Sequence, residues 1–525
     1  MKPGIGLGWL FASVVLFAGI MRPLAAEPAS PLVAERPYFT MFAASIDRLL
    51  AACRVVFDAV DRPDLSGSLG DRMKTYRDFS GIDKSRPIGM MSTWDENLPA
   101  NIVFLPVSQI DDLLKTATFG IVGYHEVSPG QYEIERPGLP YHVLVKKDYA
   151  FFAESIATVR GISVTPGQLT QGLRERYDFV ISFDFLQIPR STKERIVADM
   201  RRDIEPWLQP QDDEVSESAN LRRSLGKMTL GLVERAVLDA KSLTVGIRLD
   251  PESGHLTLEV IADAVPKSSL ATAFNRLQSH RSEFASLLQP DVPAGLAINL
   301  PVGTLVEQIL GESGDTTTKG SQLEAGLQLA GSRIGDLTLV TALHGTQAGR
   351  INDAIPELLL KLEKNGAFVS VRENVDFHHG VVLHSMTPRE IPGWFSEWVG
   401  TDIEIVVGQG KQTVWMGIGS PSTLVDRIID AIDRVDEAPV TREFGPLVRG
   451  RFQASKLPEI LQSTPLIPND DLSAAREILS RGDDGFSLTI EPVKDGLKLR
   501  LDAEEGLIRL LGKDWVKQID AAIAE

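Results

Sequence analysis

The stretch LTVGIRLDPESGHLTLEVIADAVPKSSLATAF (residues 243–274) shows the clearest structural pattern in the chain. From Leu243 to Leu249 apolar residues alternate with polar or small ones, which predicts a strand with one apolar and one solvated face. A second strand and a helix capped by Ser268 are predicted to follow. The C-terminal stretch FSLTIEPVKDGLKLRLDAEEG (residues 486–506) resembles this unit.

Another kind of segment also occurs twice. PANIVFLPVSQIDDLL (residues 99–114) predicts a strand and a helix, followed by hairpins at 123–135 and 141–155 and by a short helix. Residues 337–362 predict the same strand and helix, with Pro356 either starting or kinking the helix. Hairpins at 374–386 and 403–420 and a final helix follow. The repeated order predicts an α+β fold, in which two related halves of antiparallel sheets have helices packed on one face.

The expected domains follow from these patterns and from polar stretches at 209–218 and 311–320. We expect a signal peptide followed by four units. The expected limits are 1–26 for the signal peptide, 38–175 and 176–290 for the first half, and 291–445 and 446–525 for the second half.

The N-terminus has the features of an export signal. Lys2 precedes an apolar run at residues 5–21, and Leu24, Ala25 and Ala26 provide small residues at a cleavage point. A retained membrane anchor is the alternative, because the run approaches the roughly 18 residues that a spanning helix needs. We therefore expect an exported protein that is periplasmic, attached to the cell envelope or secreted.

Composition excludes several classes of protein. The chain has 525 residues, 43% of them hydrophobic, and a formal net charge of −17. These values are ordinary for a globular protein and not for a disordered or multi-span membrane protein. An acidic chain without a Lys/Arg block is also a poor ligand for nucleic acid. The only cysteine, Cys53, lies at helical spacing among apolar residues, so we expect it to be buried and not lipidated.

Histidines form the main candidate for metal binding. His378, His379 and His384 fall within seven residues, and they could hold zinc if Asp376 or His344 supplied a fourth ligand. The alternative is a set of ordinary histidines, because a turn at Gly380 would place them on opposite arms of a hairpin.

The other candidate motifs give weaker indications of a binding or catalytic site. Trp394, Phe395 and Trp398 could line an apolar ligand pocket, or they could plug the end of a sheet. The Gly408–Lys411 turn lacks the glycine and the Ser/Thr of a phosphate-binding loop, so we expect no nucleotide. No serine fits a Gly-x-Ser-x-Gly motif, and no catalytic residue or cofactor is predicted.

Four stretches resemble a family of uncharacterised exported proteins common in planctomycete-type bacteria. They are SIDRLLAACRVVFDAV (residues 45–60), GIDKSRPIGMMSTW (81–94), FLPV (104–107) and GVVLH (380–384). The resemblance spans most of the mature chain and consists of hydrophobic and turn positions. It implies an envelope location and a paired α+β architecture, and it implies no catalytic residues.

Three hypotheses for the function follow. The first is a non-enzymatic exported protein of the cell envelope that binds or scaffolds an unidentified envelope protein through its sheet faces. The second is a carrier of an apolar ligand such as a lipid, which Trp394 and Trp398 could contact. The third is a hydrolase that uses loop carboxylates or the three histidines.

Overall fold

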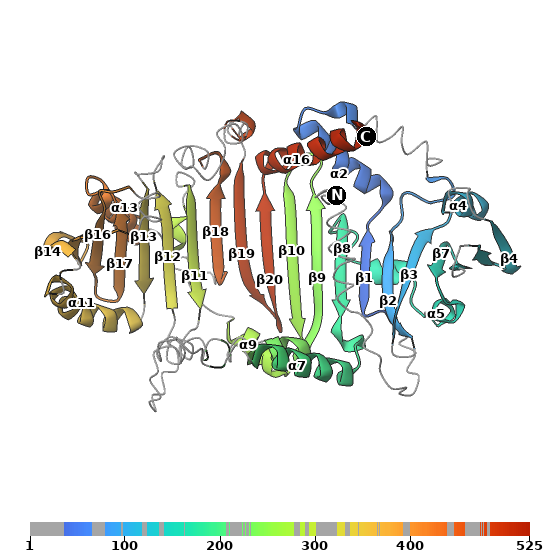
Figure 1. The fold of residues 1–525 in the computed structure, drawn as a ribbon, viewed down its shortest axis with the longest axis horizontal. Coiled ribbons are helices and arrows are strands. Elements are labelled where there is room, and N and C mark those ends of the chain that lie inside the picture. The colour runs from blue at the N-terminus through green and yellow to red at the C-terminus, as the bar shows by residue number, and fades with distance from the viewer. Residues whose placement is uncertain are drawn as a thin grey trace. The chain divides into compact units, whose positions relative to one another are not determined.

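The computed structural model describes most of the chain after residue 35. The described segments are 36–65, 79–95, 98–117, 123–135, 141–161, 163–205, 233–277, 284–288, 293–300, 323–330, 337–344, 346–364, 368–391, 400–437, 446–456, 477–479 and 484–524, with a few single positions between them. The chain divides into two compact units. Figure 1 labels their helices and strands. The first unit comprises 1–196, 240–264 and 508–525, and the second comprises 197–239 and 265–507.

The described residues of the first unit form ten antiparallel strands. They are β1 (Phe39–Ala43), β2 (Ile88–Asp95), β3 (Leu98–Pro106), β4 (Tyr124–Ser128), β5 (Gln131–Ile134), β6 (Tyr141–Lys146), β7 (Tyr149–Ala153), β8 (Phe179–Asp184), β9 (Ala240–Leu249) and β10 (Leu256–Ala264). Their order in the sheet is β10-β9-β8-β1-β2-β3-β7-β6-β5-β4.

The second unit contains another ten. They are β11 (Ala294–Leu300), β12 (Leu323–Ala330), β13 (Thr338–His344), β14 (Phe368–His378), β15 (Val381–Pro388), β16 (Glu404–Gln409), β17 (Thr413–Gly419), β18 (Val448–Gln453), β19 (Gly485–Val493) and β20 (Gly496–Ala503). Their order is β20-β19-β18-β11-β12-β13-β17-β16-β15-β14. Each strand of the second unit therefore occupies the place of the strand numbered ten lower in the first.

The helices of the first unit pack where the strand pattern leaves apolar faces. They are α2 (Ile46–Ala59), α4 (Ile110–Ala117), α5 (Ile156–Arg160), α6 (Pro166–Thr170), the 3₁₀ turn η2 (Phe185–Gln187) and the C-terminal α16 (Glu505–Ala524). Along β3, Ile102 and Phe104 join a core beneath α5 and α6, whereas Leu105 packs with Leu113 and Leu114 of α4 on the opposite face. Ser45 caps α2, because its hydroxyl accepts a hydrogen bond from the Arg48 amide.

The second unit is built in the same way. Its helical elements are α9 (Ser269–Arg276), the 3₁₀ turns η4 (Phe284–Leu287) and η5 (Ala454–Lys456), α11 (Thr346–Lys364) and α13 (Leu424–Glu437), while α7 (Arg190–Ile204) spans the boundary at 196/197. Helix α11 packs through Ile355 and Leu359 against Val414 of β17. On the other face of β17, α13 approaches closely at Gly417, where a Cβ added to the glycine would lie 2.6 Å from Ile428 Cδ1.

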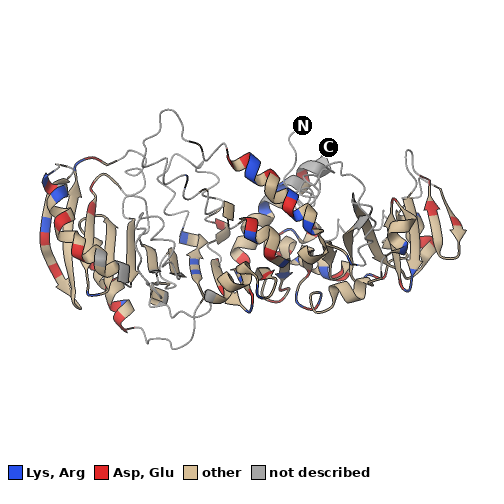
Figure 2. Ribbon diagram, turned by 90° about the horizontal axis from the view of Figure 1, so that it is seen from below, with Lys and Arg blue, Asp and Glu red and all other residues tan. Residues whose placement is uncertain are grey.

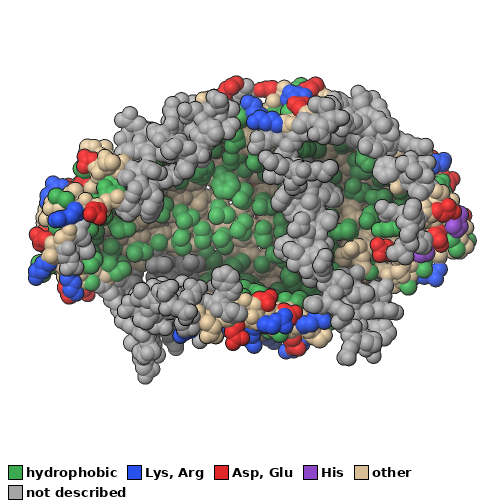
Figure 3. Space-filling view, in the orientation of Figure 1, with side chains coloured by type: hydrophobic (Ala, Val, Ile, Leu, Met, Phe, Trp, Pro, Cys, Tyr) green, Lys and Arg blue, Asp and Glu red, His purple; other side chains and the backbone are tan. Residues whose placement is uncertain are grey.

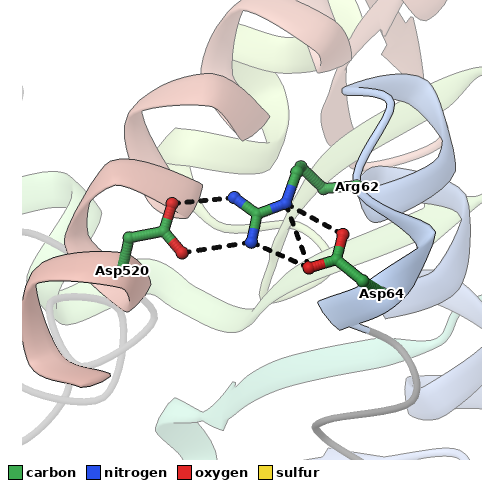
Figure 4. Close-up of polar contacts among 3 residues, drawn as sticks. All are labelled: Arg62, Asp64 and Asp520. Carbon is green, nitrogen blue, oxygen red and sulfur yellow. Dashed lines mark hydrogen bonds and ion pairs between the residues drawn. The ribbon is translucent and has the colours of Figure 1, made fainter. Parts of the chain in front are cut away.

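Helix α16 belongs to the first unit from Ile508 onward. Trp515 stacks on Phe57 of α2, with ring centroids 5.0 Å apart and an interplanar angle of 17°. Arg62 joins the two helices at the surface (Figure 4). Its Nε donates to Asp64 Oδ1 at 2.9 Å and its Nη1 donates to Asp520 Oδ2 at 2.7 Å. The guanidinium lowers the pKa of the Asp64 carboxyl below its ordinary value. Because these groups are exposed, the apolar contact carries most of the attachment.

The structure confirms the α+β class with antiparallel sheets in both halves. The helices pack on both faces of the sheets and not on one, since α4 lies opposite α5 and α6, and α11 lies opposite α13. The alternating stretch that begins at Leu243 forms β9 and β10, and Ser268 caps α9 as expected, with its hydroxyl accepting from the Ala271 amide at 3.1 Å. Pro356 lies inside α11 and does not start it. The expected sequence limits at 175/176, 290/291 and 445/446 stay predictions. Along the described helices, acidic and basic residues are interspersed (Figure 2).

Candidate functional site

One face of the second unit's sheet gathers half-buried apolar side chains. Antiparallel register places Leu488 opposite Leu501 and Ile490 opposite Leu499, and it continues the row to Val448 and Ile298. We call this surface the apolar face. It consists of Leu296, Ile298, Leu327, Val448, Phe452, Leu488, Ile490, Leu499 and Leu501. Figure 3 shows hydrophobic side chains gathered over these strands.

The opposite face of β18, β19 and β20 is polar. Thr489 of β19 lies between Arg449 of β18 and Arg500 of β20, and Arg500 Nε bonds Asp502 Oδ2 at 2.8 Å. In an antiparallel sheet with one solvated face, the other face normally forms the core. Here each residue of the apolar face is only half-buried, whereas Ala297, which alternates with Leu296 and Ile298 on β11, is 4% exposed.

The corresponding strands of the first unit repeat this pattern. Ile247 of β9 pairs with Leu258 of β10 and with Phe179 of β8, and Val245 pairs with Val260 and Ile181. All six side chains are half-buried. Phe179 and Ile181 also pack against a buried cluster that includes Met41 of β1 and Ile188 after η2, so part of this surface is covered by the chain itself. The two units therefore share a half-buried apolar sheet surface as well as a strand order.

A pocket of about 470 Å³ lies on the other face of the first unit. Its lining is mostly polar and includes Thr40, Gln168, Ser182 and Asp184. Gln168 and Asp184 already serve local structure: Gln168 completes the capping box of α6, and Asp184 accepts from the Leu186 amide at 3.0 Å. The pocket is therefore a poor match for an apolar ligand.

Two buried carboxylates each form an ion pair with an arginine. Glu259 is 6% exposed and accepts hydrogen bonds from Tyr177 Oη and from Arg176 Nη2, the latter at 2.9 Å. Burial, followed by the hydrogen bond to Glu259, raises the pKa of Tyr177 to about 12. Glu404 is 2% exposed and accepts from Ser385 and Arg372. Because each carboxylate has an arginine partner, a structural role is enough to explain its burial.

Cys53 lies on α2 among the apolar side chains that meet α16. It is half-buried, and desolvation by burial raises the pKa of its thiol. A thiol in this environment is seldom ionised at neutral pH, so it packs as a small apolar residue.

The structure brings two of the three predicted histidines together. His378 ends β14 and His379 starts the turn to β15, and their rings stack with centroids 4.5 Å apart. His384 lies apart from them; it is 5% exposed and its Nδ1 accepts from the Asn374 amide at 3.4 Å. Asp376 accepts from the Phe377 amide and His344 bonds Thr413, so neither is a fourth member of the group.

The carboxylates beside His378 and His379 come from α13. His378 Nε2 lies 2.5 Å from Asp433 Oδ1, and His379 Nδ1 lies 2.6 Å from Asp436 Oδ2. Sequence reasoning missed both aspartates. The sequence did contain a hint of them: they are three residues apart, a spacing that places both on one side of a helix.

Trp394, Phe395 and Trp398 lie outside the described residues, and so do the acidic pairs at 212–213 and 470–471. No helix in the described part of the chain has the length and apolar content needed to cross a membrane. No protein-family model, curated protein or solved structure matches the chain.

Proposed function

We propose that this is a non-enzymatic, exported binding protein of the cell envelope, and that the apolar face binds an apolar chain such as the acyl chain of a lipid. The observation that carries the proposal is the row of half-buried Leu, Ile and Val side chains across β11, β18, β19 and β20. A contiguous apolar surface that the fold leaves only half-buried is a candidate site for a ligand or partner. The export signal expected at residues 1–26 supports the location.

The size of the face favours a lipid over a protein partner. Five neighbouring strands at about 4.8 Å spacing make it about 19 Å wide, and five residues of strand make it about 14 Å long. The resulting footprint of about 270 Å² is well below the roughly 800 Å² that each partner buries in a stable protein complex. The shared strand order of the two units further suggests a duplicated unit, with the first unit providing a related, partly covered surface.

The test is saturable binding of a dansyl-labelled long-chain fatty acid to the mature protein, with displacement by unlabelled oleate. Leu488→Gln/Leu501→Gln removes two facing leucines. If each ligand contact contributes about 1 kcal/mol, half of full burial, the double variant should bind about thirtyfold more weakly.

Ser487→Gln/Thr489→Gln is the matched control, because these residues alternate with the leucines and lie on the polar face of the same strand. The control should bind as the wild type does. The proposal is wrong if the wild type shows no saturable binding, or if both double variants lose affinity equally.

A further inference from the structure

The hairpin β14–β15 and helix α13 bring metal-ligating atoms together on the second unit. His378 and His379 and Asp433 each offer one such atom, and the three atoms lie within 4.8 Å of one another. We infer that His378 Nε2, His379 Nε2 and Asp433 Oδ1 form a site for a divalent transition metal ion, with Zn²⁺ the best match to two imidazoles and one carboxylate. This site is separate from the apolar face and does not depend on its function.

The distances suit a tetrahedral ion. Zn²⁺ bonds nitrogen and oxygen at about 2.0–2.1 Å, so two ligand atoms of a tetrahedral site lie about 3.3 Å apart. Asp433 Oδ1 is 2.5 Å from His378 Nε2 and 3.7 Å from His379 Nε2. Each of these two separations therefore differs from the required spacing by less than about 1 Å.

Asp436 contacts His379 and does not contact the proposed metal position. Its carboxylate can only accept, so His379 Nδ1 donates to Asp436 Oδ2 at 2.6 Å. This bond fixes the tautomer of His379 and leaves its Nε2 lone pair for the metal. A carboxylate behind a metal-ligating histidine is the usual arrangement at zinc sites. Asp436 is therefore a positioning residue and not a ligand.

The backbone holds the four side chains in place. His379 and Gly380 form the two-residue turn between β14 and β15, with φ values of 45° and 81°, so both imidazoles lie at the tip of one hairpin. Helix α13 is anchored by Leu424 and Ile428, both 0% exposed, and it presents Asp433 and Asp436 in its C-terminal half.

The local charge and exposure also favour a cation. The negative end of the α13 dipole adds to the charge of the two aspartates, and a positive ion there is stabilised by both. The side chains of His378 and Asp433 are 27% and 36% exposed, so an ion can enter from solvent and water can complete its coordination.

The experiment is a calorimetric titration of the metal-stripped, full mature chain with Zn²⁺, repeated with Co²⁺ as a spectroscopic probe. We expect one Zn²⁺ per chain and the absorption of four-coordinate Co²⁺ with nitrogen ligands. Ca²⁺ should not compete, because it requires six to eight oxygen ligands. The variants His378→Ala, His379→Ala and Asp433→Asn should each abolish the Co²⁺ signal.

Asp436→Asn tests the positioning role. It should weaken Zn²⁺ binding by about 10–100-fold while leaving a four-coordinate Co²⁺ spectrum. Asp426→Asn, in the first turn of α13, changes the charge of the same helix by the same amount, and His125→Ala removes an exposed histidine from the first unit. Both controls should bind Zn²⁺ as the wild type does.

Circular dichroism of each variant separates loss of the site from loss of the fold. The inference is overturned by absence of stoichiometric Zn²⁺ binding to the wild type, by a six-coordinate Co²⁺ spectrum, by displacement with Ca²⁺, or by equal effects of Asp426→Asn and Asp433→Asn.

Discussion

Replacing Gly246 with alanine should destabilise the first unit, because the ring of Tyr177 lies directly over this glycine. A Cβ at position 246 would be 2.5 Å from Tyr177 Cδ1, far inside van der Waals contact. If the ring stays, the strand must shift, and overpacking of this kind costs about 1–3 kcal/mol. If the ring moves away, the bond from Tyr177 to the buried Glu259 is lost, which costs about 1.5–3 kcal/mol. Either response lowers the stability of the first unit by about 2 kcal/mol.

Hydrogen exchange of the amides of β8 and β9, read by mass spectrometry under conditions where exchange reports the opening equilibrium, measures this cost locally. A loss of about 2 kcal/mol corresponds to about thirtyfold faster exchange. The decisive comparison is the same substitution in a Tyr177→Ala background, where Gly246→Ala should cost less than about 0.5 kcal/mol because the ring is gone. Equal costs in the two backgrounds would refute the reasoning.

Three other outcomes are expected. Arg372→Ala should lower the free energy of unfolding in urea by about 3 kcal/mol, since it leaves Glu404 buried without its cation; a loss below about 1 kcal/mol would contradict this. The pKa of Tyr177 is raised from 10.0 to about 12, so its stabilisation is present below pH 10 and is lost as pH rises toward 12. Between pH 10 and pH 12 the melting temperature of Tyr177→Phe should therefore fall less steeply with pH than that of the wild type. Parallel curves would contradict the stabilising role of the Tyr177 hydroxyl. Cys53 should react slowly with a disulfide reagent in the native protein and rapidly in denaturant, because burial raises its pKa; equal rates would show that the thiol is exposed.

The local elements of the fold could be predicted from sequence, but their long-range pairing could not. Alternation from Leu243 onward identified β9 and β10, because period-two hydrophobicity is a property of one strand. Strand β1 pairs with β2 and with β8, and β11 pairs with β12 and with β18. These partners are separated by long stretches of chain, and single-sequence spacing contains no information on which distant strands adjoin.

The histidine group shows the same limit. The sequence indicated His378 and His379 as ligands. The expected partners, Asp376 and His344, instead bond Phe377 and Thr413. The actual neighbour, Asp433, is 55 residues away along the chain and arrives through the docking of a helix on a glycine-containing strand. His384 lies on the opposite face of β15 from Val381, the partner of His378, because the two positions are three residues apart on one strand.

The membership of residues 508–525 in the first unit has a consequence for biosynthesis. A nascent chain emerges from its N-terminus, yet the apolar side of α2 around Phe57 receives Trp515 only after more than 450 further residues have been made. A chain truncated before α16 would therefore lack a contact needed by the part of the molecule made first. A protease encountering such a product should cut near α2, and the full-length protein should resist it there.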